Sequence, residues 1–474
     1  MDAIAAVVLA AGKGTRMKSD RAKVLHQACG RPLAYFPIRA AFALDCAPVV
    51  AVVGHQADLV EKELSQLFPG APLEFALQKD QLGTGHAVAS AQAALKRSGF
   101  SDRGSVLLLC GDTPLVTAET LQQLVRVKRE ARAPLAFIIT RPADPKGYGR
   151  IVRNEKGFPE RIVEEKDASA AEKKIGEVNA GIYLVDAPFL FKALGQANRN
   201  NAQGEYYLTD IVSAAAAAAR EGRAPWSTTI EASEEEVSGV NDRAQLAWSA
   251  ARLRERRLSA LMRDGVTIVD PAATYVDEGV EIGADTVLEP LVSLRGKTRL
   301  GRGVEVGQGC VLVDMEVADG ARILPYSHLT ASQVGKGAIV GPFARLRPGA
   351  QLGEGSHVGN FVEIKKTVLG KGSKANHLSY LGDAVIGEGV NVGAGTITCN
   401  YDGVNKFVTT LGDGVFIGSD TQLVAPVKVG KGAYVGSGST VREDVPAGSL
   451  AVSAGKQRNI EGWVEKKAPR KKSR

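Results

Sequence analysis

Apolar residues in the C-terminal part of this 474-residue chain recur at every sixth position. Two unbroken series carry the pattern: Val334, Val340, Leu346, Leu352, Val358 and Ile364, then Leu411, Ile417, Leu423, Val429, Val435 and Val441. A period of six fits neither the period of about 3.6 of an amphipathic helix nor the period of about two of a strand. It is the hexapeptide repeat of a parallel β-helix, in which each aliphatic side chain points inward from one flat side of a triangular coil.

Two polar stretches, residues 365–385 and 399–410, interrupt this rhythm. The first contains His377, and the second contains Asn400 and Tyr401. Segments that leave a rigid solenoid tend to carry function, so we expect two functional loops here. For His377, the alternative is an ordinary solvated loop histidine.

Residues 1 to about 230 alternate short apolar runs with helical patterns. Strands are predicted at residues 49–53, 73–77, 106–110, 135–139 and 182–185, and helices at 84–97 and 118–131. This alternation favours an α/β domain with a largely parallel sheet that binds ligands at the carboxyl ends of its strands.

A long amphipathic helix is predicted from about Asp242, which would cap it, to Arg263, with Gly265 after its end. It separates two regions of different pattern and indicates a helical arm between domains. We expect four parts: an α/β domain at 1–240, a linker helix at 241–263, a β-helix domain at 264–460 and a basic tail at 461–474.

The first predicted strand ends in a glycine-rich loop at residues 12–16. Glycines let backbone N–H groups approach a ligand closely, and Lys13, Arg16 and Lys23 add positive charge. This combination suits a nucleoside triphosphate. The loop matches neither the dinucleotide fingerprint nor the P-loop, and an ordinary strand–turn–helix connection is the alternative.

An acid, Asp112, follows the buried-looking run at residues 106–110. A carboxylate at this point can hold Mg²⁺ against phosphates, because hard cations prefer oxygen ligands. A turn or helix-capping aspartate is the alternative.

Composition narrows the class of protein. Apolar residues make up 44% and charged residues 23%, as in soluble globular proteins. The net charge of +7 lies mostly in residues 466–474, where we expect a solvated tail and no nucleic-acid or membrane binding. No apolar stretch approaches the ~20 residues of a membrane span, and no signal-peptide pattern opens the chain. The five cysteines are scattered, which favours reduced thiols in a cytoplasm.

Residues 9–17 with 23–25 resemble the signature of sugar-phosphate nucleotidyltransferases. Such a loop, a helical arm and a hexapeptide β-helix in that order resemble the bacterial bifunctional N-acetylglucosamine-1-phosphate uridyltransferases/glucosamine-1-phosphate acetyltransferases, the GlmU family. Further motifs similar to that family are residues 81–86, 147–151, 239–243, 358–363 and, most specifically, 393–403.

The resemblance implies a Rossmann-like nucleotidyltransferase domain followed by a left-handed parallel β-helix. It also implies acetyl transfer from acetyl-CoA to glucosamine-1-phosphate and then Mg²⁺-dependent uridylyl transfer from UTP, which together make UDP-N-acetylglucosamine for cell-wall and lipopolysaccharide precursors. The implied assembly is a cytoplasmic homotrimer.

For uridylyl transfer the resemblance implies that Arg16 and Lys23 neutralise phosphate charge, and that Asp112 and Asn241 are the magnesium ligands. The implied nucleotide- and UDP-sugar-binding residues are Leu9, Ala10, Ala11, Gly12, Lys23, Gln78, Gly83, Thr84, Gly111, Asp112, Gly149, Glu164, Asn179 and Asn241.

For acetyl transfer the resemblance implies that His377 is the general base, a role that suits imidazole. The implied glucosamine-1-phosphate ligands are Arg347, Lys365, Tyr380 and Asn391. The implied acetyl-CoA ligands are Ala394, Asn400, Tyr401, Ser419, Ser437 and Lys456.

Three positions depart from the family pattern. Cys110 stands where a tyrosine often precedes Gly-Asp, and Ala180 stands where a hydroxyl residue is common. Ala454 replaces an arginine expected near the coenzyme phosphates, and we hypothesise that Lys456 takes over that contact as a point charge.

Two rival functions differ from the bifunctional enzyme. A single-activity nucleotidyltransferase would use the β-helix only for oligomerisation or regulation, and would not need His377, Asn391, Asn400 and Tyr401 together. A non-enzymatic scaffold should have lost Arg16, Lys23 or Asp112, and all three are present.

Overall fold

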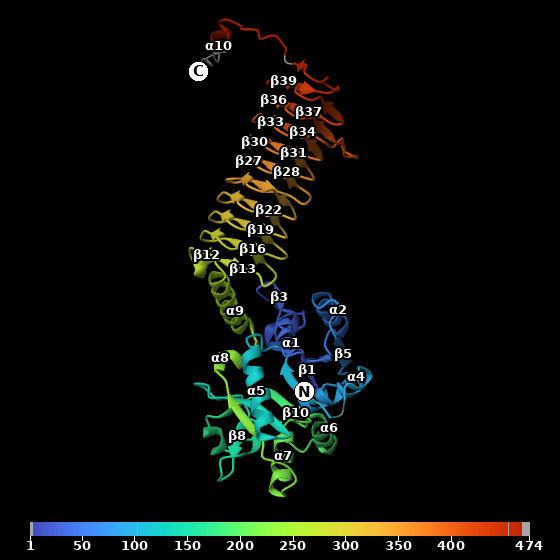
Figure 1. Ribbon diagram of the computed structural model, residues 1–474, viewed down its shortest axis with the longest axis vertical. Helices are drawn as coiled ribbons and strands as arrows, with labels where there is room; N and C mark the ends of the chain where they lie inside the picture. Colours follow the sequence, from blue (N-terminus) through green and yellow to red (C-terminus); the bar gives the residue numbers. More distant parts are fainter. Residues whose placement is uncertain (1–2, 102, 454, 467–474) are drawn as a thin grey trace, which may run out of the picture. The chain divides into compact units, whose positions relative to one another are not determined.

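The computed structural model describes residues 3–101, 103–453 and 455–466 (Figure 1). The chain divides into two compact units, residues 1–254 and 255–474. The predicted four-part division is finer than this one and stays a prediction. Most of the predicted basic tail, residues 467–474, lies outside the described residues, as does Ala454.

The first unit is built on a mixed sheet of order β11-β7-β10-β6-β1-β4-β5. Its strands are β1 (Ile4–Ala10), β4 (Val49–Val53), β5 (Leu73–Leu77), β6 (Ser105–Cys110), β7 (Leu135–Thr140), β10 (Val178–Asp186) and β11 (Thr228–Glu231). Neighbours pair in parallel except at β10, which is antiparallel to β6 and β7. The largely parallel sheet is therefore confirmed, with one reversed strand. A hairpin of β8 (Arg150–Arg153) and β9 (Pro159–Val163) pairs with β10.

Helices cover both faces of this sheet, because its strands are apolar on both sides. One face packs against α1 (Tyr35–Phe42), α2 (Ala57–Leu67) and α5 (Ala118–Ala131). The other packs against α3 (Thr84–Ser90), α4 (Gln92–Arg97), α6 (Ala187–Gln196) and α7 (Asp210–Arg220). The helix predicted at 84–97 is thus two helices, because a tight turn at Ala91, whose N–H bonds to Val88 O, separates them.

Helix α9 (Arg243–Arg263) begins and ends as its sequence predicts. The Asp242 carboxylate accepts the Gln245 N–H at 2.8 Å, an N-cap contact. Gly265, at φ +93°, follows the last turn, and the Val266 N–H bonds back to Leu261 O at 3.0 Å. In the described part of the chain, no helix combines the length and the apolar content that a bilayer crossing requires.

The second unit is a left-handed parallel β-helix. Within the described residues, three parallel sheets of eleven, ten and nine strands run from β12 (Thr267–Ile268) to β41 (Leu450–Ala451). Successive coils stack along one axis in Figure 1, and each contributes strands to the three sheets. All twelve aliphatic residues of the two hexad series are buried in one core, which confirms the repeat.

One of the two predicted functional loops is wrong. Residues 365–385 stay in the coil as β29 (Val368–Leu369), β30 (Lys374–His377), β31 (Tyr380–Gly382) and the start of β32 (Ala384–Ile386). Leu369, Ala375 and Leu381 fill the inward positions. The six-residue count fails there only because some coils have 17 residues, as from Gln351 to its partner Val368, where others have 18.

The second segment does leave the coil as predicted, and its functional role stays a prediction. Residues 400–408 leave the coil between β34 (Ile397–Cys399) and β35 (Thr409–Leu411). Ala384 pairs with Thr409, 25 positions on, so this coil carries an insertion. An isolated bridge between Tyr401 and Lys406 closes the inserted loop.

Candidate functional site

The glycine-rich loop after β1 is packed directly against Lys23. Gly14 has φ +60°, and a Cβ placed there would lie 2.4 Å from the Lys23 Cβ. Two short 3-10 helices follow, Thr15–Met17 and Lys23–Leu25, and bury Met17 and Leu25 beneath the loop. Glycine at position 14 therefore permits both the left-handed turn and the close approach of the Lys23 stem.

Four predicted residues converge at one end of this loop. Lys23 Nζ donates to Asp112 Oδ2 and, at 3.4 Å, to Asn241 Oδ1. Arg16 donates to the same Asn241 oxygen at 2.8 Å. The Val240 N–H bonds to Asp112 O at 2.8 Å, and the Asn241 N–H donates to the Gln245 side chain at 2.7 Å. Distant parts of the sequence thus form one charged cluster with two oxygen donors suited to Mg²⁺.

A cleft of about 330 Å³ opens beside this cluster. Its lining includes the predicted residues Leu9, Ala11, Gly12, Lys23, Gln78, Gly83, Thr84 and Asp112. Two further predicted residues do not line it: Ala10 is buried within β1, and Gly111 packs its backbone against Leu9 O. Gln81 also lines the cleft and donates to Ala11 O at 2.8 Å. It was not predicted as a binding residue, although it is the first residue of the motif at 81–86.

A second group of predicted residues meets at the β8–β10 junction. The Asn179 N–H donates to Gly149 O at 2.9 Å, and a Cβ on Gly149 would lie 3.5 Å from both Glu164 carboxylate oxygens. Thr209, which lies in none of the sequence motifs, donates its hydroxyl to Glu164 Oε1 at 3.1 Å. Burial raises the pKa of the Glu164 carboxyl above its ordinary value.

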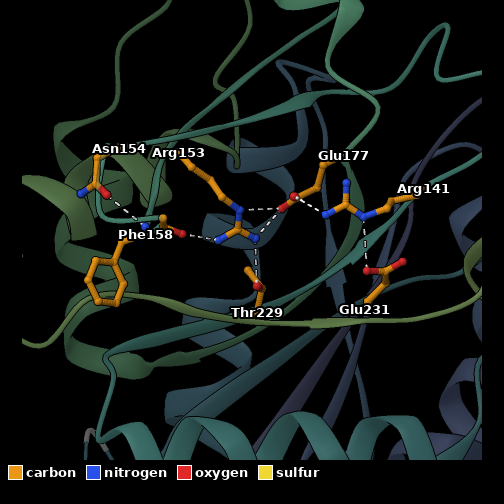
Figure 2. A network of polar contacts seen from close by, with 8 residues as sticks. Arg141, Arg153, Asn154, Phe158, Glu177, Thr229 and Glu231 are labelled. Atoms are coloured by element: carbon orange, nitrogen blue, oxygen red, sulfur yellow. Dashed lines mark hydrogen bonds and ion pairs between the residues drawn. The ribbon is translucent and has the colours of Figure 1, made fainter.

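The strand that follows Gly149 is braced from its far end by an ionic network (Figure 2). The buried Glu177 carboxylate accepts from Arg141 at 2.9 Å and from Arg153 Nε at 2.9 Å. Arg153 also donates to the Thr229 hydroxyl at 3.1 Å, and Arg141 pairs with Glu231 at 3.3 Å. The network joins β8 and β11 to the ends of β7 and β10, so it holds the strand that leads back to Gly149.

In the β-helix, His377 ends β30 and faces Asn360 on the preceding coil. The two residues are register partners, and His377 Nδ1 lies 3.0 Å from Asn360 Oδ1. The Ser379 hydroxyl donates to His377 O at 2.8 Å. Asn360 was missed as a single residue, although it lies inside the motif at 358–363.

Three more predicted residues lie within two coils of His377 along the β-helix and contact acidic side chains. Arg347 donates to Glu363 at 2.9 Å, and Lys365 lies 3.9 Å from the Asp383 carboxylate. Asn400 also donates to Asp383.

Lys406, from the inserted loop, reaches this group. The hydrogen bond and charge of Lys365 lower the pKa of Lys406. Tyr380 lies over Gly382, where a Cβ would meet the tyrosine oxygen at 2.4 Å and Asn400 Nδ2 at 2.9 Å. The acids Glu363 and Asp383 and the cation Lys406 were not predicted.

The remaining predicted residues lie elsewhere on the β-helix. Asn391 pairs with Lys374 on the His377 strand, Ala394 O accepts the Asp420 N–H at 2.6 Å, and Ser419 O accepts the Gly438 N–H at 2.8 Å. The other three lie at a coil corner, in the inserted loop and after β41: Ser437, Tyr401 and Lys456. Their ligand roles stay predictions, and the hypothesis linking Lys456 to Ala454 falls partly outside the described residues.

The chain matches two described protein families. Residues 6–260 match the MobA-like NTP transferase domain. Residues 331–366 and 409–443 match the bacterial transferase hexapeptide repeats.

Relatives align with this chain over almost its whole length. It is 56% identical to the bifunctional protein GlmU of Anaeromyxobacter sp. (strain Fw109-5), over 98% of this chain and 93% of the relative. It is 51% identical to the GlmU of Pelobacter propionicus, over 98% of both chains, and 48% identical to that of Geobacter sulfurreducens, over 98% and 99%. An NTP transferase domain and hexapeptide repeats occur in this one chain, and these relatives align with nearly all of it. The chain therefore belongs to the GlmU family of bifunctional transferases.

Proposed function

We propose that this chain makes UDP-N-acetylglucosamine in two steps at two separate sites. The β-helix transfers an acetyl group from acetyl-CoA to the amine of glucosamine-1-phosphate. The N-terminal domain then transfers the uridylyl group of UTP to N-acetylglucosamine-1-phosphate and releases pyrophosphate. Family membership excludes a non-enzymatic scaffold and a nucleotidyltransferase of single activity.

The convergence of Lys23, Arg16, Asp112 and Asn241 is the observation that carries uridylyl transfer. A phosphate oxygen of the sugar attacks the α-phosphorus of UTP in line, and pyrophosphate leaves on the opposite side. Because this nucleophile is already anionic, the reaction needs no general base. Arg16 and Lys23 neutralise the charge that develops on the phosphates.

Asp112 and Asn241 supply the two protein oxygens that would hold Mg²⁺. Among the described residues no group of three or more His, Cys, Asp or Glu side chains could hold a metal ion. This fits a magnesium ion that takes its remaining ligands from phosphates and water. The bound ion supplies further charge neutralisation at the phosphates.

For acetyl transfer, we assign the general base to His377. With Asn360 Oδ1 accepting from Nδ1–H, the other ring nitrogen is free to take a proton. The substrate amine attacks the thioester carbon, loses its proton to Nε2 and expels the coenzyme A thiolate. Arg347 and Lys365 offer charge to the sugar phosphate.

An exposed apolar ladder beside His377 supports assembly into a homotrimer. Tyr326, Phe343 and Phe361 stack on successive coils with ring centroids 5.4 Å apart, and each ring residue is about half exposed, at 49%, 49% and 57%. The exposed Leu378 continues the ladder, and its N–H bonds to Asn360 O. Contiguous apolar surface of this kind is typical of an interface, and we propose that a second copy of the chain covers it.

Two variants test the assignment in the full-length protein. Incubation with glucosamine-1-phosphate, acetyl-CoA, UTP and Mg²⁺ should yield UDP-N-acetylglucosamine by mass spectrometry. Asp112→Ala should stop the reaction at N-acetylglucosamine-1-phosphate, and His377→Ala should leave glucosamine-1-phosphate unacetylated. If His377→Ala also stopped uridylyl transfer from supplied N-acetylglucosamine-1-phosphate, the two-site proposal would be wrong.

A further inference from the structure

The segment that carries Lys23 is tied to helix α2 by side chains that none of the motifs contains. Gln56 precedes the first residue of α2 and holds a left-handed conformation, φ 53° and ψ 41°. Its side-chain oxygen accepts the Ala22 N–H at 2.7 Å, and its amide nitrogen donates to Asp20 O at 2.8 Å. One side chain therefore binds the backbone on both sides of Arg21, immediately before Lys23.

A second tie reinforces the first from about two turns along α2. Arg21 donates to both carboxylate oxygens of Glu63, at 3.0 and 2.7 Å, and its Nε donates to Leu25 O at 3.0 Å. The short helix Lys23–Leu25 therefore has one tie before it and one at its end. From this base the Lys23 stem passes over Gly14 to reach Asp112 and Asn241.

The left-handed conformation at position 56 favours a specific role for the amide. A residue with a Cβ is strained in this region, and glycine is not. Any gain from glutamine must therefore come from its side chain, whose amide is the group that bonds the Asp20–Ala22 backbone. Gln56 therefore keeps a strained backbone conformation while its side chain holds the Asp20–Ala22 backbone in place. Strained residues of this kind are common near functional sites.

We propose that Gln56 is a positioning residue for uridylyl transfer, which sets the Lys23 ammonium at the phosphates through the Asp20–Ala22 backbone. The inference rests on the role proposed above for Lys23. Because Lys23 acts on charge that develops during the reaction, a displaced ammonium lowers kcat more than it raises the KM for UTP.

Two substitutions separate positioning from stability. Gln56→Gly removes the amide and also the strain, whereas Gln56→Met removes the amide and keeps a side chain of similar length. Both should lower the kcat of uridylyl transfer by about 10- to 100-fold, the scale of a displacement near 1 Å. The melting temperature of Gln56→Gly should exceed that of Gln56→Met, because glycine relieves the backbone strain that methionine keeps, so equal losses of kcat in the two variants cannot come from unfolding. Acetyl transfer should be unchanged in both.

The controls are Arg132→Gly and Lys23→Met. Arg132 is exposed and has φ 51° directly after α5. Arg132→Gly therefore relieves the same kind of backbone strain away from the site, and the kcat of uridylyl transfer should not change. Activity is measured as pyrophosphate release from UTP, N-acetylglucosamine-1-phosphate and Mg²⁺ by the full chain. If either Gln56 variant kept kcat within twofold while Lys23→Met lost it, the positioning role would be wrong. If Lys23→Met itself were fully active, the role proposed for Lys23 would be wrong, and the inference about Gln56 would be wrong with it.

Discussion

Replacing Gly359 by alanine tests how closely the β-helix coils hold His377. Gly359 lies in β27 (His357–Asn360), directly before the asparagine that bonds the histidine. A Cβ there would lie 2.0 Å from Asn376 O and 2.6 Å from its carbonyl carbon, on the next coil. A relaxed carbon–oxygen contact is ~3.3 Å, so the two coils would have to separate locally by about 1 Å.

The expected cost follows from that separation. Overpacking of this kind destabilises by roughly 1–3 kcal/mol. The same shift lengthens the bond of 3.0 Å between Asn360 and His377, and a base displaced by about 1 Å can lose roughly 100-fold in rate. Acetyl transfer should therefore fall about 100-fold, while uridylyl transfer in the other domain should not change.

Gly355 on the same coil provides the matched control. It has φ +62°, and no atom lies within 4 Å of the point that a Cβ would occupy, so alanine there adds backbone strain of about 1 kcal/mol and no contact. Acetyl transfer is followed by release of the free thiol of coenzyme A, uridylyl transfer by pyrophosphate release, and stability by thermal unfolding. Gly355→Ala should lose stability and keep acetyl transfer. Full acetyltransferase activity in a folded Gly359→Ala protein would refute the argument.

Three further predictions use other parts of the molecule. Burial raises the pKa of the Glu164 carboxyl above its ordinary 4.5, so the folded state binds the carboxyl proton more tightly than the unfolded chain does. Ionisation of Glu164 therefore lowers the stability of the folded state as the pH rises above 4.5. Glu164→Gln should thus gain stability relative to the wild type as the pH rises above 4.5, measured by urea unfolding; a constant difference would contradict this. Glu177→Ala should lower the free energy of unfolding by about 2 kcal/mol, since Arg141 and Arg153 lose their buried carboxylate but keep access to water. An unchanged midpoint of urea unfolding would contradict the bracing role. Cys110 should resist iodoacetamide at pH 8 in the native protein, because burial raises the pKa of its thiol to about 12; rapid labelling found by mass spectrometry would contradict this.

Periodicity alone located many of the strands and three of the helical segments. The helix predicted at 118–131 is α5, and the strands predicted at 49–53 and 73–77 are β4 and β5. The hexad aliphatics are all buried. These features are local, because the side-chain spacing of a strand, helix or triangular coil is set by its own backbone geometry, and a run of residues reveals it.

The candidate sites required more than periodicity. The pattern singled out Lys23, Asp112 and His377 as separate candidates, each with an ordinary alternative. The family resemblance joined Asp112 to Asn241, and the structure brings both to Lys23. Their catalytic roles stay predictions, but their proximity is a property of the fold.

The sequence by itself determined the two kinds of domain, the inward positions of the β-helix and the glycine-rich, positively charged character of the first loop. Only the tertiary structure decided that residues 365–385 remain in the coil, that Asn360 faces His377, and that Gln56 holds the Asp20–Ala22 backbone. The physical reason is register: whether a coil takes 17 or 18 residues sets which side chains meet across it, and this depends on packing between coils. The Gln56 contact likewise joins segments 34 residues apart, which no local period relates.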